Sequence, residues 1–146
     1  MNKKAPLSVQ TVSLAIAQLM PNIIRGVQLD FFAKRAITQT QFLMIVGIHA
    51  YGRCTMGKLA KNMKIKMPTA TGLADRLAKA GYAKRFNDVE DRRKVWIELT
   101  PKGKQFIAEF QTVLRRRWEE VMRVLAPGEL ESFYQVVSKL RDSLHG

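Results

Sequence analysis

The chain has 146 residues, 47% of them hydrophobic, and a formal net charge of +13. These values describe one ordinary globular domain that attracts polyanions, and the absence of an apolar run of about 18 residues or a signal-like start argues against a membrane span or export. With one cysteine, Cys54, and two histidines, His49 and His145, the sequence excludes an internal disulfide and offers few soft ligands, so we expect no metal or cofactor.

The first predicted element is a helix from Ser8 to about Phe32 that is apolar on two sides. One stripe comprises Val9, Val12, Ile16, Leu19, Ile23 and Val27, and a second comprises Met20, Ile24 and Phe31. A helix that is apolar on two sides needs two packing partners, which suggests a subunit interface. Pro21 lies inside the pattern and predicts a bend or a break.

Three shorter helices are predicted next. Thr38 and Gln41 have the spacing of a capping box, and the helix they begin ends at Gly52. Thr55 can cap a second helix, and Pro68 suits the first turn of a third, which ends at Gly81. The last two helices are therefore separated by a tight turn.

The third of these helices is predicted to have two unlike faces. Its apolar residues are Ala70, Leu73, Ala74 and Leu77, and its outward residues are Thr69, Thr71, Gly72, Arg76 and Lys79. A basic, hydroxyl-bearing outer face suits a DNA groove.

The remainder of the chain is read as a hairpin followed by two helices. Residues 82–86 and 95–99 alternate as strands do, and a charged turn, residues 87–94, separates them. Thr100 and Pro101 begin a helix of about 25 residues. The helix after Pro127 and Gly128 has the 3, 4, 3, 4 spacing of lengthwise packing, at Leu130, Phe133, Val137, Leu140 and Leu144. The arginines at 115–117 are expected to make surface ion pairs with Glu119 and Glu120, or dimer contacts.

This order of elements is that of a winged helix-turn-helix, whose second helix enters the major groove. The distribution of charge along the chain supports this assignment. Residues 53–104 hold fourteen Lys and Arg against five Asp and Glu, and the other 94 residues hold eleven against seven. The charged turn could also be an ordinary solvated hairpin tip, but the helix pair beside it favours a DNA-binding wing.

The sequence closely resembles the MarR (multiple antibiotic resistance regulator) family. The resemblance lies in residues 55–60, 69–71 and 75–77, then Gly81, Arg85, residues 91–93 and residues 99–103. It implies a homodimer held by the N- and C-terminal helices, with Thr69, Thr71 and Arg76 on the recognition helix. It also implies that Arg92 and Arg93 lie on a wing along the minor groove, oriented by Asp91. Gly72 departs from the family, which often has a long polar or basic side chain there.

The DNA-binding residues expected from the resemblance and the charge pattern form one set. They are Lys58, Lys64, Lys66, Pro68, Thr69, Thr71, Arg76, Lys79, Arg85, Asp91, Arg92, Arg93 and Lys94. Arginine suits a narrow minor groove, and threonines at a helix N-terminus can contact phosphates or thymine methyl groups.

The remaining candidate residues can each be interpreted as functional or as purely structural. Phe31, Phe32 and Trp118, with Trp96, could line an effector cavity, although aromatic residues at helical spacing are more often core. His49 is included in the effector set, but a lone histidine is more often a core or boundary residue. Cys54 is interpreted as a structural thiol rather than a redox sensor.

We therefore expect a mainly α fold with a small β-hairpin wing. Residues 1–35 would form an N-terminal dimerisation helix, 36–104 the winged helix-turn-helix, and 105–146 the C-terminal dimerisation helices. The expected function is site-specific binding of a pseudo-palindromic double-stranded operator by a cytoplasmic, nucleoid-associated homodimer, a repressor released by a small aromatic or anionic effector. The alternatives are activation, or a sequence-tolerant architectural or anti-silencing DNA-binding protein. No catalytic constellation is evident, so we expect no enzyme and no membrane partner.

Overall fold

The structure is a computed structural model that describes residues 6–144, apart from the side chains of Leu29, Asp30 and Ala33; His145 lies outside the described residues. The chain divides into two compact units. The helical unit contains the described residues up to Gly26 and from Leu114 onward, and the head contains Val27–Val113. No helix in the described part of the chain is long and apolar enough to cross a membrane.

Three helices contribute to the helical unit. α1 spans Val9–Phe31 as one helix with Pro21 inside it, α5 spans Pro101–Met122, and α6 spans Pro127–Leu144. Thr100 begins α5 as predicted, because its hydroxyl accepts the amide of Gly103 at 3.2 Å. The helix continues through the predicted arginine run, whose ion pairs are confirmed: Arg115 with Glu119, and Arg117 with Glu120.

The head begins with the end of α1 and a short 3-10 helix, Phe32–Lys34. α2 (Gln39–Tyr51) has the predicted capping box, with the Thr38 side chain accepting the Gln41 amide and the Gln41 side chain accepting the Thr38 amide. Gly52 ends the helix with a φ of 72°, a conformation that favours glycine. The remaining head helices are α3 (Met56–Met63) and α4 (Met67–Lys79), and they pack on α2.

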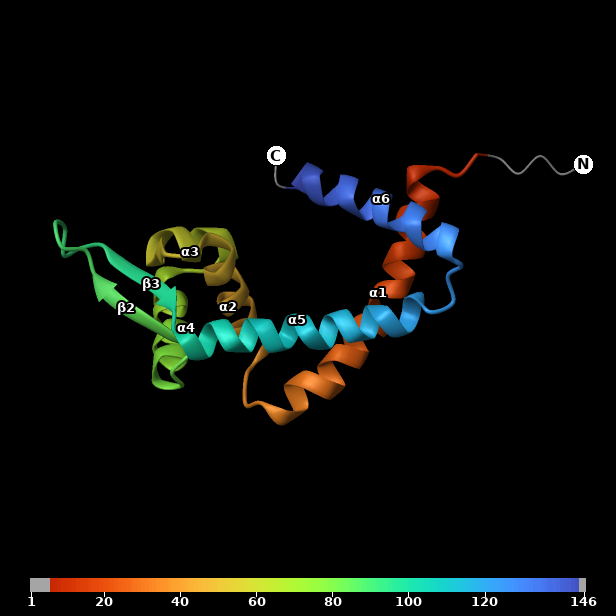
Figure 1. Ribbon diagram of the computed structural model, residues 1–146. Coiled ribbons are helices and arrows are strands. Elements are labelled where there is room, and N and C mark those ends of the chain that lie inside the picture. The colour runs from red at the N-terminus through yellow and green to blue at the C-terminus, as the bar shows by residue number, and fades with distance from the viewer. Residues whose placement is uncertain (1–5, 145–146) are drawn as a thin grey trace, which may run out of the picture. The chain divides into compact units, whose positions relative to one another are not determined.

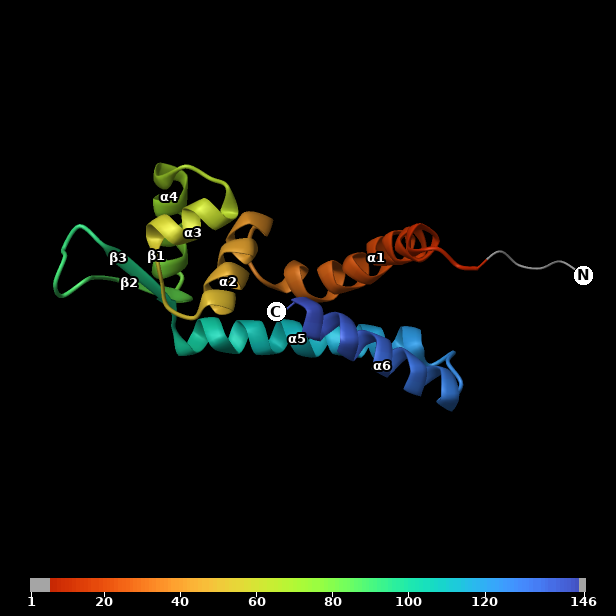
Figure 2. The ribbon, with the colours of Figure 1, turned by 90° about the horizontal axis from the view of Figure 1, so that it is seen from above.

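A small antiparallel sheet completes the head. β2 (Ala83–Asn87) and β3 (Val95–Leu99) form the predicted hairpin, which extends away from α3 and α4 (Figure 1). The hairpin is not the whole sheet, because β1 (Cys54–Thr55) pairs with the other edge of β3 and gives the order β1-β3-β2. Figure 2 shows β1 at the base of the hairpin, where it leads into α3. A two-residue strand is too short to produce an alternating pattern, so the sequence analysis missed it.

The core of the head joins all of its elements. Fully buried side chains come from α2, α3, α4 and β3; they include Met44, Ile45, Ile48, Leu59, Leu77 and Ile97. Phe31 is also fully buried, and its ring contacts those of Phe32, Phe106 and Phe110 at centroid distances of 5.0–5.5 Å. These contacts anchor the end of α1 and the start of α5 within the head.

Candidate nucleic-acid interface

The recognition helix predicted from the sequence is α4. Its apolar residues Ala70, Leu73, Ala74 and Leu77 are buried, as expected. Of the outward residues, Thr69, Arg76 and Lys79 are exposed, whereas Thr71 and Gly72 are half-buried. A Cβ added to Gly72 would meet no atom within 4 Å, so this part of the face is open.

Three of the predicted lysines are exposed at the turn between α3 and α4 or on α3 itself. Lys64 ends α3 in the left-handed conformation (φ 54°), and Lys66 is the N-cap residue of α4, followed by the exposed Pro68. On α3, the exposed Lys58 has its ammonium 4.7 Å from the centre of the Tyr51 ring. Lys64 and Lys66 therefore place positive charge next to the N-terminal end of α4.

The wing turn is organised by two aspartates. The Asp88 carboxylate accepts the amides of Glu90 and Asp91, and the Asp91 carboxylate accepts the amide and Nε of Arg93 at 3.1 and 3.2 Å. The Arg93 side chain nevertheless remains 93% exposed, and Arg92 and Lys94 are exposed as well. The wing cations are therefore available to a partner.

A groove connects the recognition helix with the wing. It has a volume of about 480 Å³, and the predicted DNA-binding residues that line it are Thr71, Arg85, Arg93 and Lys94. Met56, Met67 and Val95 contribute apolar surface to the same groove. Arg85 is held there by an ion pair with Asp75 of α4, a partner that the sequence analysis did not predict.

The C-terminal end of α4 is fastened to the start of α5. The Thr100 hydroxyl donates to the Gly81 carbonyl, and the Lys102 ammonium donates to the Ala80 carbonyl at 2.7 Å. The Lys102 ammonium nitrogen also lies 4.6 Å from the centre of the Tyr82 ring. We call the three residues Thr100, Lys102 and Gly103 the α5 clamp. They belong to the motif at 99–103, but the sequence analysis did not predict which residues they would contact.

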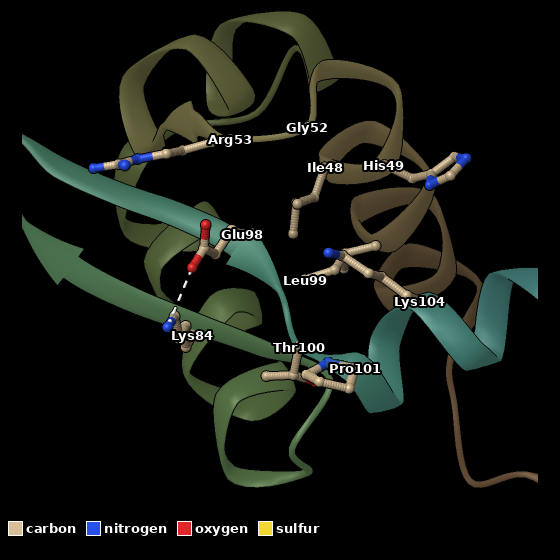
Figure 3. A pocket seen from close by; sticks show the side chains of 10 residues that line it. All are labelled: Ile48, His49, Gly52, Arg53, Lys84, Glu98, Leu99, Thr100, Pro101 and Lys104. Carbon is tan, nitrogen blue, oxygen red and sulfur yellow. Dashed lines mark ion pairs between the residues drawn. The ribbon is translucent and has the colours of Figure 1, made fainter.

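The four candidate effector residues are divided between the two units: three belong to the head and Trp118 belongs to the helical unit. Phe31 and Phe32 lie in the aromatic core of the head. His49 lines a different pocket of the head, of about 380 Å³, together with Arg53, Lys84 and Lys104, and Glu98 there pairs with Lys84 at 3.2 Å (Figure 3). Trp118 belongs to the helical unit, where it lines an apolar groove against α6.

Cys54 has the surroundings of a structural thiol. Cys54 is only 2% exposed. Burial raises the pKa of the thiol, and the positive charge of the nearby Lys58 partly opposes this rise. Because the thiolate is the reactive form, these surroundings disfavour reaction at Cys54. Among the described residues, no group of three His, Cys, Asp or Glu side chains could hold a metal ion.

Comparison with known proteins agrees with this geometry. A family model described as the MarR family matches residues 37–95. The HTH-type transcriptional repressor YetL of Bacillus subtilis (strain 168) is 31% identical over 116 residues, which cover 78% of this chain and 70% of YetL.

Solved structures share the fold at lower identity. A transcriptional regulator from Thermotoga maritima has a TM-score of 0.80 at 21% identity, covering 93% of this chain and 95% of that one. A Staphylococcus aureus MepR mutant bound to an oligodeoxyribonucleotide has a TM-score of 0.70 at 20% identity, covering 92% and 98%. The family model and the identity to YetL show that the chain belongs to the MarR family of DNA-binding transcription regulators.

Proposed function

We propose that this chain is a site-specific regulator that binds double-stranded DNA as a homodimer, with α4 in the major groove and the wing in the adjacent minor groove. The observation that carries the proposal is the shared groove, which is lined by Thr71 of α4 together with Arg93 and Lys94 of the wing. In a winged helix-turn-helix, these two elements contact neighbouring grooves of one duplex. The reading head would then comprise residues 36–104.

Charge supports the same surface. Arg76 and Lys79 lie exposed on α4, and Arg92 and Arg93 lie exposed on the wing. Lysine and arginine release counterions from phosphates, and an arginine near a narrow minor groove meets an enhanced negative potential. The proposed DNA-binding set is the one expected from the sequence, with Asp91 orienting Arg93.

The homodimer is supported by apolar surface on α6, which has no buried residue in the described chain. Leu130, Phe133, Val137 and Leu140 are each 40–54% exposed along one helix. Contiguous exposed apolar surface of this kind marks an interaction site. Two heads related by a twofold axis would bind a pseudo-palindrome with half-sites one helical turn apart.

Repression with release by an effector is the regulatory part of the proposal. Binding at a promoter blocks polymerase, and YetL, which is similar to this chain, carries the name of a repressor. A small aromatic or anionic molecule that favours one spacing of the two heads would weaken DNA binding. We expect the protein on the nucleoid in the cytoplasm, and the proposal requires no cofactor or catalytic activity.

Selection from randomised duplex DNA at near-physiological salt tests the proposal. We expect an enriched palindrome that binds at least about 10³-fold more tightly than scrambled DNA. The open space at Gly72 and the high charge favour the architectural alternative, for which the selection would yield no enriched site and binding would weaken steeply with salt.

A further inference from the structure

The wing turn is tied to the sheet through one side chain, Asp88. One of its carboxylate oxygens, Oδ1, accepts the amides of Glu90 at 2.9 Å and Asp91 at 3.1 Å. The other, Oδ2, accepts the indole N–H of Trp96 at 2.7 Å. The backbone amide of Asp88 donates to the carbonyl of Lys94 at 2.9 Å. Asp88 therefore connects the first half of the turn to strand β3.

The indole of Trp96 is itself held in place. Trp96 pairs with Phe86 across the two strands, and the Arg53 guanidinium lies over both rings, 4.4 Å from the centre of Phe86 and 5.1 Å from that of Trp96. Arg53 lies immediately before β1, at the base of the sheet. A stacked cation and a cross-strand aromatic pair restrict the ring, and so they fix the direction of its N–H group.

The hydrogen bonds of Asp88 also restrict the segment that carries the wing cations. Asp88 holds the amide of Asp91, and the Asp91 carboxylate accepts the amide and Nε of Arg93. The Arg93–Asp91 pair alone is too exposed to fix a side chain, since exposed ion pairs contribute about 0–1 kcal/mol. The three donors to Asp88 hold the turn more firmly, because hydrogen bonds to a charged group are the stronger ones.

We propose that Asp88 and Trp96 are positioning residues of the wing, whose hydrogen bond orders the turn that presents Arg92 and Arg93 before DNA binds. The inference rests on the proposed function. Its physical basis is preorganisation: a turn that is already ordered loses less entropy on binding. A simple charge argument predicts the opposite effect of Asp88, because a carboxylate close to DNA phosphates repels them.

The two arguments predict opposite effects of Asp88 on the affinity for DNA, so a substitution of Asp88 distinguishes them. Asp88→Asn removes a negative charge but also places an amide N–H₂ donor or a weaker acceptor against the Trp96 indole and the two backbone amides. We expect the affinity for the selected operator to fall by about tenfold. The matched control is Glu90→Gln, which removes the same charge from an exposed neighbour and is expected to bind equally or more tightly. If Asp88→Asn binds as tightly as Glu90→Gln, the inference is overturned.

A second variant leaves the charge unchanged. Trp96→Phe keeps an aromatic ring for Arg53 and Phe86 to contact, although a smaller one, and removes the N–H donor, so we expect weaker binding here too. The double variant should bind about as weakly as Asp88→Asn alone, because both changes remove one interaction. Full additivity of the two losses, or no loss in Trp96→Phe, would contradict the proposed hydrogen bond.

Repeating the DNA selection with Asp88→Asn separates positioning from general destabilisation. We expect the preference at positions read by α4 to persist, while the preference at the flanking minor-groove positions is lost. Equal loss at both sets of positions would show that the variant damages the whole head and would overturn the inference. If the unmodified protein and Glu90→Gln select no site, the proposed function fails, and the inference fails with it.

Discussion

Gly103 lies so close to Tyr82 that a Cβ on Gly103 would overlap the carbonyl oxygen of Tyr82. The same carbonyl accepts the amide of Thr100 at 3.1 Å, so it is fixed between two residues of the α5 clamp. Only glycine allows α5 to begin this close to the segment that follows α4.

We therefore predict that Gly103→Ala lowers the free energy of unfolding by about 1–3 kcal/mol, the usual cost of overpacking. Thermal or urea denaturation measures the change. Gly57→Ala in α3 is the control, because its Cβ would meet no atom within 4 Å, and it should raise stability by about 0.5–1 kcal/mol. A neutral Gly103→Ala would mean that the clamp yields easily.

Lys102→Met should weaken operator binding although Lys102 is not proposed to contact DNA. The variant loses the donor to Ala80 and thereby loosens the end of α4. The slope of log affinity against log salt should stay the same, whereas Lys79→Met should reduce it by about 0.9, as expected for one lost phosphate contact. Equal slope changes in the two variants would show that Lys102 binds phosphate itself.

Replacing both wing arginines, Arg92 and Arg93, with alanine should abolish detectable operator binding at near-physiological salt and leave the dimer intact. Fluorescence anisotropy with a labelled duplex measures the binding, and sedimentation measures the dimer. Alanine at Arg116 and Arg123 removes the same charge from exposed positions of α5 and the residues after it. If that control loses as much affinity, net charge rather than wing position explains the effect.

The apolar face of α6 should be required for association. Val137→Glu, at a position 44% exposed in one chain, places a charge on the proposed subunit interface. We expect sedimentation equilibrium to show a monomer at concentrations at which the unmodified protein is a dimer, because an unpaired charge is costly to bury. Gln135→Glu on the same helix is the control, and a dimeric Val137→Glu would place the interface elsewhere.

Acid should weaken the head through Glu109. The hydrogen bond from Arg35, at 2.5 Å, and a second from Gln105 lower the pKa of Glu109. A lowered pKa in the folded state adds stability above the ordinary glutamate pKa, and this stability is lost as the pH falls below that range and through the lowered folded pKa. Glu109→Gln should therefore melt at a lower temperature at pH 7, and the difference should shrink on acidification. Parallel melting curves across this range would contradict the pairing.

Local signals in the sequence predicted most elements of the fold. Thr38 and Thr55 mark helix starts through hydrogen bonds within one turn, and Pro68 marks one through its fixed φ, so their residue types are sufficient to identify them. The alternation in residues 95–99 likewise predicts β3 from its own residues. Long-range pairing leaves no such signal: β1 is defined only by its pairing with Trp96 and Ile97 of β3, and Arg85 pairs with Asp75 only after folding.

The candidate interface shows the same division. The composition and spacing of the motif predicted the residues of α4 and the wing, and the structure brings several of them to one groove. The link from Asp88 to Trp96 depends on a hairpin turn whose geometry no spacing rule specifies. The effector set stays a prediction, because an aromatic or imidazole side chain does not indicate by itself which cavity it will face.

The open space above Gly72 gives this regulator an unusual freedom to evolve. A Cβ there would meet no atom within 4 Å, and nearly any residue would favour the helix more than glycine does. On the proposed function, a substitution at this position of α4 could thus change the DNA-binding surface without a clash at the Cβ. Most substitutions lower the stability of a fold, but at this position of the proposed recognition helix a change of binding specificity would not begin with that cost.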